Sequence, residues 1–364
     1  MFGRGMAANP LLQLCLLTEG DPAQLTGGYL YHRRMAAAAP EHQAKLDFVS
    51  IPRRPFPLAT GDARRRLRQL ESVDGILLDS IIAGVAAPWI GRLADGKRMI
   101  GVIHQQPGGV DYGPLRSRLQ ARFDLLAYRQ IAGLIAASDY LADRLHRQGL
   151  PASRITVVPP GRDPAEGQPP VPAGDLRRGR KLGAICISNW THNKGIHWLL
   201  DAIARLPPDT ATLHLVGDMT AEPSYARRMA QRIAQNDLRD RIVTHGALTS
   251  VEVAGLLQAA DVLVHPSLHE AYATVCAEAM AAGIAVVASR VDNLPYLLKD
   301  GVEGILTSPG DVEAIASALA LLAADPERRM AIGRAAYARA ATRPTWAQSA
   351  DRFFATIRDR LTGK

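Results

Sequence analysis

The sequence predicts an α/β protein with two doubly wound domains in tandem, and three observations lead to this fold class. The chain has 364 residues, whereas a single hydrophobic core stops growing at about 250 to 300 residues. Its composition, with 47% hydrophobic and 21% charged residues, is typical of a soluble globular protein. Apolar strand-like runs alternate with segments of helical periodicity, which is the pattern of parallel sheets built from βαβ units.

The first domain is expected over residues 1–163, where apolar runs of strand length recur. These expected strands lie at residues 11–17, 46–51, 75–78, 99–104, 133–137 and 155–158. Residues 164–181 follow, with four prolines, three glycines and a basic cluster. Such a composition is typical of a linker between domains.

The second domain is expected over residues 182–343 and repeats the alternation. Strands are expected at 182–188, 213–216, 242–244, 262–265 and 284–288, and helices at 224–235 and 274–282. Another helix carries one apolar stripe at helical spacing, formed by Ile196, Leu199, Leu200, Ile203 and Leu206. Thr249-x-x-Glu252 is a capping box that opens a further helix.

The segment 344–364 lies beyond the second sheet and contains a last helix, expected at 344–361. We expect this crossover helix to pack back on the first domain. Two doubly wound domains facing each other would place a ligand cleft between them, at the carboxyl ends of the strands.

Composition also limits the compartment and the bound groups. The three cysteines, Cys15, Cys186 and Cys276, lie far apart between apolar residues, which predicts reduced core thiols in a cytoplasmic protein. No apolar run reaches the roughly 18 to 20 residues of a membrane span. No Asp-x-Asp triplet occurs to hold a metal-bound diphosphate, so we expect no metal. Gly3-Arg-Gly5 and the run from Gly91 to Lys97 resemble phosphate loops only by chance, because the expected strands and helices do not flank them correctly.

The net charge of +8 lies mainly in the first 163 residues and favours an anionic partner. Two segments carry most of it. One holds Arg64, Arg65, Arg66 and Arg68; in the other, Arg116, Arg118, Arg122 and Arg129 surround Leu115, Leu119, Phe123 and Leu126. This basic amphipathic pattern suits an anionic membrane surface or a phosphorylated acceptor, and an ordinary solvated helix face explains it equally well. Nucleic acid is disfavoured, because aromatic residues do not alternate with these arginines.

The most informative stretch is residues 266–283, in which a loop after a strand leads into a helix that ends at glycine. Glu278 lies inside this apolar helix, where a buried carboxylate needs a hydrogen-bonding partner, structural or functional. Glu270 stands just before the helix, whose free N–H groups favour an anion such as a diphosphate.

These residues resemble the signature of retaining glycosyltransferase family 4, which has the GT-B fold. The resemblance rests on Glu270-x7-Glu278 and on several shorter motifs in the family order. In the second half these are Asn193-Lys194-Gly195, 215–218, 241–246 and 300–306; in the first half, more weakly, they are Thr26-Gly27-Gly28, Ile103-His104 and 157–163.

The resemblance implies transfer of a sugar from a nucleotide-sugar donor to an unidentified acceptor, with retention of configuration and without metal or other cofactor. It implies that Glu270 contacts the donor sugar, that Lys194 neutralises the diphosphate and that His104 bonds a sugar hydroxyl. The implied donor-binding residues are Glu278 at the ribose, Gly27 and Gly28 at the phosphate or acceptor, and Asn189, Asp218, Ala271, Tyr272 and Ala273. From the residues alone, His104 could equally be an ordinary histidine at a strand end, and Asp218 a helix cap.

Three positions depart from the family pattern, and all of them bear on diphosphate binding. Asn189 stands where the family usually has an arginine, five residues before the lysine. Ala271 and Ala273 stand where the family usually has glycines, so this loop needs backbone angles that alanine resists if it keeps the family conformation. A nucleotide-sugar-binding protein that has lost turnover is therefore the alternative to an active enzyme.

Overall fold

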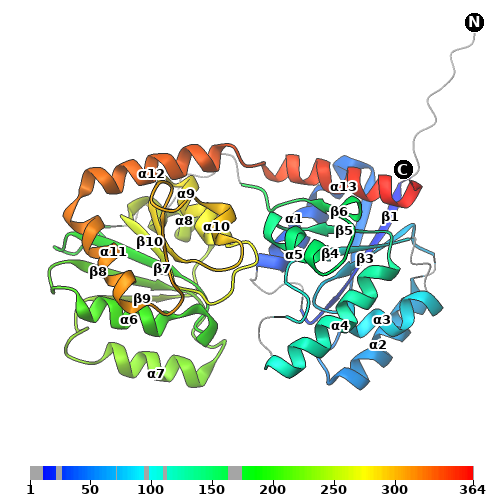
Figure 1. Cartoon of the computed structure of the whole chain (residues 1–364), viewed down its shortest axis with the longest axis horizontal. Helices are drawn as coiled ribbons and strands as arrows, with labels where there is room; N and C mark the ends of the chain where they lie inside the picture. The colour runs from blue at the N-terminus through cyan, green and yellow to red at the C-terminus, as the bar shows by residue number, and fades with distance from the viewer. Residues whose placement is uncertain are drawn as a thin grey trace, which may run out of the picture. The chain divides into compact units, whose positions relative to one another are not determined.

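The computed structural model describes residues 11–21, 27–70, 72–93, 98–109, 113–162 and 174–363. The chain forms two compact units (Figure 1). Unit 1 comprises Met1–Gly161 together with Pro344–Lys364, and unit 2 comprises Arg162–Arg343. Gly3, Gly5, Thr26, Gly96, Lys97 and Asp163, which the sequence motifs include, lie outside the described residues.

Unit 1 is built on a parallel sheet whose described strands follow the order β2-β1-β3-β4-β5-β6. The strands are β1 (Leu12–Glu19), β2 (Ala44–Ile51), β3 (Gly75–Asp79), β4 (Met99–Ile103), β5 (Gly133–Ala136) and β6 (Ile155–Val157). Its helices are α1 (Gly27–Ala38), α2 (Phe56–Gln69), α3 (Ala83–Leu93), α4 (Pro114–Gln130), α5 (Asp139–Arg147) and α13 (Trp346–Thr362). Every residue of β3 and β4 is buried, as expected for strands covered on both faces.

The direction of each crossover decides which face of this sheet a helix covers. The chain moves one way from β1 to β2 and the opposite way from β2 through β5, so right-handed crossovers put α1 on one face and α2, α3 and α4 on the other (Figure 1). The helix α13 joins α1: its Phe353, Phe354 and Ile357 are fully buried with Tyr31 and Met35 of α1. The last helix therefore packs back on the first sheet, as predicted.

Unit 2 repeats the design with the order β12-β11-β10-β7-β8-β9 among its described strands. The strands are β7 (Leu182–Ile187), β8 (Ala211–Val216), β9 (Ile242–Gly246), β10 (Val262–His265), β11 (Ala285–Ser289) and β12 (Ile305–Thr307). The helices are α6 (Ile196–Arg205), α7 (Pro223–Ile233), α8 (Ser250–Ala259), α9 (Thr274–Ala281), α10 (Leu294–Leu297), α11 (Val312–Ala324) and α12 (Pro326–Ala341). The predicted capping box of Thr249 and Glu252 opens α8.

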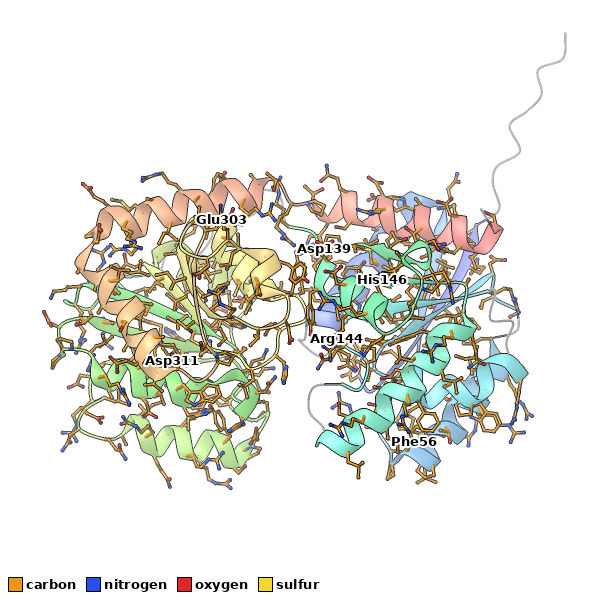
Figure 2. The ribbon with its side chains drawn as sticks, viewed as in Figure 1. Phe56, Asp139, Arg144, His146, Glu303 and Asp311 are labelled. Atoms are coloured by element: carbon orange, nitrogen blue, oxygen red, sulfur yellow. The ribbon has the colours of Figure 1, made fainter. Side chains whose placement is uncertain are left out.

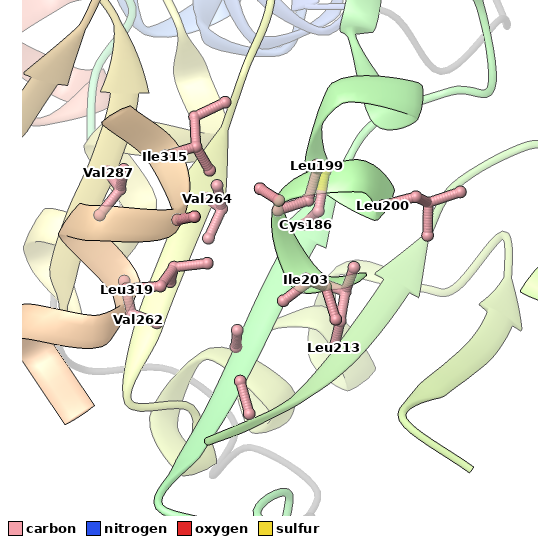
Figure 3. Packing of buried hydrophobic residues seen from close by; sticks show 14 of the residues in the cluster. Cys186, Leu199, Leu200, Ile203, Leu213, Val262, Val264, Val287, Ile315 and Leu319 are labelled. Atoms are coloured by element: carbon pink, nitrogen blue, oxygen red, sulfur yellow. The ribbon is translucent and has the colours of Figure 1, made fainter. Parts of the chain in front are cut away.

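Two apolar cores cover the faces of this second sheet. On one face, the predicted stripe of α6 meets Ile315 and Leu319 of α11 over the side chains of β7, β8 and β10 (Figure 3). On the other face, Cys276 and Met280 of α9 pack with Ala336 and Ala340 of α12. All three cysteines of the chain are free and buried.

Part of the segment interpreted as a linker belongs to unit 2. Leu176 is buried in the core that contains α9, and the Arg177 guanidinium lies 2.6 Å from the Asp261 carboxylate. Residues 164–173 of the same segment lie outside the described ranges. No helix of the described chain is both long enough and apolar enough to cross a membrane.

Candidate functional site

Each sheet has one point where the chain reverses its direction of travel, and polar loops gather there. In unit 2 this point lies between β7 and β10, because the chain proceeds from β7 towards β9 and later from β10 towards β12. Loops at the carboxyl ends of two such strands diverge and leave a crevice that suits a ligand. Lys194 lies in the loop after β7 and Glu270 in the loop after β10.

The structure brings Lys194 and Glu270 into direct contact. The Lys194 ammonium donates a hydrogen bond to Oε1 of Glu270 and forms an ion pair with it. Nε2 of His265 lies 3.0 Å from the same carboxylate oxygen. Burial by itself raises the pKa of the Glu270 carboxyl, but Lys194 and His265 outweigh burial, and this pKa lies well below its usual range. Glu270 is therefore a fixed carboxylate anion.

The backbone around Glu270 is held as firmly as its side chain. The Glu270 N–H donates to Oδ2 of Asp292 at 2.9 Å, and the Glu270 carbonyl accepts from the Asn293 N–H at 3.1 Å. On the other side, the Leu268 N–H donates to the Asn193 carbonyl at 2.8 Å. The first two bonds join the loop after β10 to the segment after β11, and the third joins it to the loop after β7, so the loops that carry Lys194 and Glu270 are tied together.

Gly195 makes this close approach of the two loops sterically possible. Its backbone is left-handed, with φ of 68°, and a Cβ at this position would lie 2.2 Å from the Pro266 carbonyl oxygen. Real side chains do not make such contacts, so the glycine of the Asn193-Lys194-Gly195 motif is required both by its backbone angle and by the neighbouring loop.

Asn189 and Asp218 lie together on the other side of the Lys194 loop, at the ends of β7 and β8. The Asn189 side-chain oxygen accepts a hydrogen bond from the Asp218 N–H at 3.2 Å. The Asp218 carboxylate accepts from the N–H and the hydroxyl of Thr220, each at 2.7 Å, and so closes a short turn. Asp218 is therefore not the cap of α7, a position that Glu222 occupies.

The loop before α9 partly fulfils the expectation about its alanines. Ala273 has φ of 66° and ψ of 57°, the left-handed conformation that glycine adopts without strain. Ala271 is not among the residues with positive φ. The N-cap residue of α9 is Ala273, which has no side-chain oxygen to accept hydrogen bonds from the first N–H groups of the helix.

One residue of this region differs from what the sequence indicates, and a second has a partner far along the chain. Glu278 is exposed to solvent and not buried in an apolar environment, because the apolar residues of α9 pack on the opposite side of the helix. Tyr272 is buried, and its hydroxyl accepts a hydrogen bond from the Arg343 guanidinium at 2.8 Å. Arg343 is the last residue of unit 2; its partnership with Tyr272 cannot be read from any local sequence pattern.

In unit 1 the reversal point lies between β1 and β3, and His104 follows the adjacent strand β4. Gly27 is the first residue of α1, and Gly28 packs beside His104: a Cβ on Gly28 would lie 3.7 Å from the His104 side chain. This is ordinary van der Waals contact, so packing within the protein does not require glycine at position 28. Burial and the neighbouring His32 lower the pKa of His104 to about 3. His104 is therefore neutral at physiological pH, and its buried Nε2 has no hydrogen-bonding partner among the described residues.

A buried polar cluster that the motifs did not reveal supports His104. His32 of α1 lies 3.0 Å from Oδ2 of Asp79, and the Thr18 hydroxyl donates to the same oxygen at 2.7 Å. The His32 and His104 rings meet edge to face, 4.6 Å apart. Burial raises the pKa of Asp79, but His32 outweighs it and the pKa falls to about 2. Thr18 and Asp79 are the first residues after the strands expected at 11–17 and 75–78. Their place at strand ends is the only feature of the sequence that could have indicated this cluster.

The described residues contain no group of three or more His, Cys, Asp or Glu side chains arranged to hold a metal ion. Each unit thus presents its own polar cluster at the carboxyl end of its sheet. The cluster in unit 2 combines a cation, a helix N-terminus and carboxylates, a combination that suits a phosphorylated sugar ligand.

Known structures share this fold over almost the whole chain. Anabaena HepE in complex with UDP and glucose superposes with a TM-score of 0.78 at 21% sequence identity, covering 96% of this chain and 100% of that one. Sucrose-phosphate synthase from Thermosynechococcus elongatus superposes with a TM-score of 0.81 at 20% identity, covering 97% and 100%. The protein therefore has the GT-B fold.

The family follows from sequence comparison. Residues 26–166 match the model of Glycosyltransferase Family 4, and residues 181–325 match Glycosyl transferases group 1. The D-inositol 3-phosphate glycosyltransferase of Xylanimonas cellulosilytica is 33% identical over 228 residues, 58% of this chain and 54% of that protein. The alpha-maltose-1-phosphate synthase of Mycolicibacterium smegmatis is 31% identical over 241 residues, 60% of each chain. The chain spans somewhat more than half the length of these curated relatives, and it belongs to glycosyltransferase family 4.

Proposed function

We propose that the protein is a retaining, metal-independent glycosyltransferase that moves a sugar from a nucleotide-sugar donor to an acceptor carrying phosphate or lipid. The observation that carries this proposal is the contact between Lys194 and Glu270 at the reversal point of the unit 2 sheet. Retention and metal independence rest on membership of the family, and the acceptor class rests on charge.

Lys194 and the N-terminus of α9 supply positive charge where the donor diphosphate would bind. When the glycosidic bond breaks, the leaving phosphate oxygen gains negative charge, and groups that are already oriented towards it lower the barrier. The Lys194 ammonium is held in place by Glu270, so it does not need to reorganise during the reaction. Glu270 is an anion held by Lys194 and His265. Its carboxylate is suited to accept hydrogen bonds from hydroxyls of the donor sugar.

The remaining residues have roles that fit their surroundings. Glu278 is exposed on α9, so its carboxylate is accessible to the ribose hydroxyls of a nucleotide. His104 is neutral and therefore able to donate a hydrogen bond to a sugar hydroxyl without placing a charge in the site. Gly28, beside it, leaves room for a ligand to approach the α1 backbone.

The relatives support the donor and acceptor classes. HepE has been crystallised with UDP-glucose, and relatives bear names such as D-inositol 3-phosphate glycosyltransferase and alpha-maltose-1-phosphate synthase. A nucleoside-diphosphate sugar and a phosphorylated acceptor are therefore the first compounds to test, and the excess of arginine in unit 1 agrees with an anionic acceptor.

The test is a screen of nucleotide sugars with phosphorylated and lipid-linked acceptors in the presence of EDTA. Mass spectrometry would detect the product and the released nucleoside diphosphate, and NMR would identify the anomer. A transferase forms product without metal and keeps the donor configuration, and Glu270→Ala slows turnover whereas Glu278→Ala weakens nucleotide binding. Donor binding without any product would favour the alternative, a sugar-nucleotide-binding protein that has lost turnover, for which Asn189 in place of arginine is the specific observation.

A further inference from the structure

The outer face of unit 1 formed by α2 and α4 has an unusual surface. Four leucines on these two helices are strongly exposed: Leu58 is 59% exposed, Leu115 83%, Leu119 55% and Leu126 44%. The two helices are linked by Phe56, labelled in Figure 2, whose ring lies 5.0 Å from that of Phe123. We call the exposed side chains of α2 and α4 the α2/α4 face. Single exposed leucines are ordinary, but four on two helices that meet through Phe56 and Phe123 indicate a contact surface.

The same face carries strong positive charge. On α4, exposed Arg118, Arg122 and Arg129 lie at helical spacing from the exposed leucines, so leucines and arginines share one stripe of the helix. On α2, Arg64, Arg65, Arg66 and Arg68 are all exposed.

The acidic residues of the two helices offset little of this charge at the surface. Each of the two helices contains one carboxylate. Asp124 is buried and accepts hydrogen bonds from the Gly108 N–H at 2.8 Å and from Gln120 at 2.9 Å. Asp62 is 12% exposed and lies 3.6 Å from Arg54 and 3.8 Å from Arg65.

We infer that the α2/α4 face docks on the surface of an anionic lipid bilayer. A bilayer matches both features of the face: the leucines enter the region between headgroups and acyl chains, and the arginines contact lipid phosphates. A soluble phosphorylated compound would engage the arginines but leave four leucines in water. This contact with lipid does not depend on the proposed transferase activity.

Docking on this face would bring the bilayer to the loop that carries His104. Helix α4 starts ten residues after His104, and Asp124 of α4 holds Gly108 of the intervening loop. If the acceptor is lipid-linked, it would enter the His104 cluster from this side.

The experiment is flotation of the full chain with vesicles of phosphatidylcholine alone and of equal parts phosphatidylcholine and phosphatidylglycerol, at low salt. We expect binding to the anionic vesicles only. Leu115→Ser combined with Leu119→Ser should lower the apparent affinity about tenfold or more, since two leucines lose apolar contact. Arg118→Ala combined with Arg122→Ala should lower it about tenfold or more, and high salt should have the same effect.

Matched controls lie on α12 of unit 2, which also exposes apolar and basic residues. Met330 and Tyr337 are 52% and 55% exposed, and Arg334 and Arg339 are exposed beside them. Met330→Ser with Tyr337→Ser, and Arg334→Ala with Arg339→Ala, should bind as the unchanged protein does. The inference is overturned if the unchanged protein binds neither vesicle or both equally, or if the control pairs weaken binding as much. Loss with the arginine pair but not with the leucine pair would also overturn it, because electrostatic adsorption alone does not need the leucines to enter the bilayer.

Discussion

At the scale of single residues, the pairing of Lys194 with Glu270 explains how a charged site persists without a ligand. Each charge is neutralised by the other, and the Glu270 carboxylate has His265 as a second partner. A diphosphate would compete with Glu270 for the Lys194 ammonium and would then share it. Asn189 cannot supply the charge that an arginine would, so Lys194 bears more of the interaction with phosphate in this protein.

Lys194→Ala should weaken the binding of a nucleoside diphosphate. Charge-assisted hydrogen bonds contribute about 1.5 to 3 kcal/mol, so we expect a roughly ten- to hundredfold rise in Kd. Asn189→Ala removes one neutral hydrogen bond to Asp218 and should change the Kd about fivefold or less. Isothermal titration calorimetry measures both. Lys181→Ala is the matched control, because Lys181 forms an exposed ion pair with Asp209; if Lys194→Ala and Lys181→Ala bound equally, the phosphate would bind elsewhere.

His104 leads to a prediction about stability at mildly acidic pH. Its pKa in the folded protein is lowered to about 3 from the ordinary 6.5, so between these values the unfolded chain binds a proton that the folded protein does not. Stability therefore falls as pH drops through this window, by up to about 1.4 kcal/mol per pH unit for one group. The lowered pKa values of Asp79 and Glu270 act only below pH 4.5.

Urea unfolding between pH 5 and pH 7 checks this prediction. Burial also lowers the pKa values of His197, His214 and His245, so the informative quantity is the difference between the protein and His104→Asn. We expect the free energy of unfolding to fall less steeply with acid in His104→Asn. Identical slopes would mean that His104 accepts a proton in the folded state, contrary to its burial beside His32.

At the scale of elements, strands were more predictable than the contacts between them. The strand expected at 262–265 is observed over the same residues, and β3 differs from 75–78 by one residue, because buried parallel strands are continuous apolar runs. The order of the strands is not a local property. Thr18 and Asp79 are 61 residues apart and meet only because β3 pairs with β1. The motifs could therefore identify Lys194, Glu270 and His104 but not the residues that position them.

The Lys194 loop gives a prediction at this scale, in which two glycines with similar backbone angles are compared. Gly195 has φ of 68° and Gly301 φ of 73°, but a Cβ on Gly195 would lie 2.2 Å from the Pro266 carbonyl oxygen whereas one on Gly301 would meet nothing within 4 Å. Both alanine variants incur the left-handed backbone cost of about 1 to 2 kcal/mol. Only Gly195→Ala also forces the two site loops apart, at a further cost of about 1 to 3 kcal/mol.

We therefore expect Gly195→Ala to be the less stable of the two variants and to lose most of its affinity for nucleotide. Gly301→Ala should retain that affinity. Thermal unfolding and calorimetric titration of the two variants provide the comparison. Equal loss of affinity in both variants would show that the contact between the Gly195 and Pro266 loops does not shape the site.

At the scale of the whole molecule, the two units have separate cores, although the chain order does not separate them cleanly. Residues 344–364 belong to unit 1, although they follow unit 2 in the sequence. The sequence indicates this arrangement, because a segment with helical periodicity follows the last strand expected in the second sheet. Local patterns do not show that residues 174–181 join unit 2, since Leu176 is a single apolar residue among charged ones.

The separate cores predict that each unit responds to its own core substitutions. Phe353 of α13 is 1% exposed in unit 1, and Leu319 of α11 is fully buried in unit 2. Truncation of such side chains to alanine costs about 2 to 5 kcal/mol. We expect Phe353→Ala to lower the unfolding temperature of unit 1 and to leave the Kd for a nucleoside diphosphate unchanged, because Lys194, Glu270 and Glu278 all lie in unit 2. Leu319→Ala should lower the unfolding temperature of unit 2. Arg352→Ala, at an exposed neighbour on α13, should change neither unfolding temperature.

Differential scanning calorimetry with and without nucleotide measures the two unfolding temperatures. Ligand at a hundred times its Kd should stabilise unit 2 by about 2.7 kcal/mol. A Phe353→Ala variant that lost nucleotide affinity as fully as Lys194→Ala would show that the nucleotide site depends on unit 1, and the assignment of the site to unit 2 alone would be wrong.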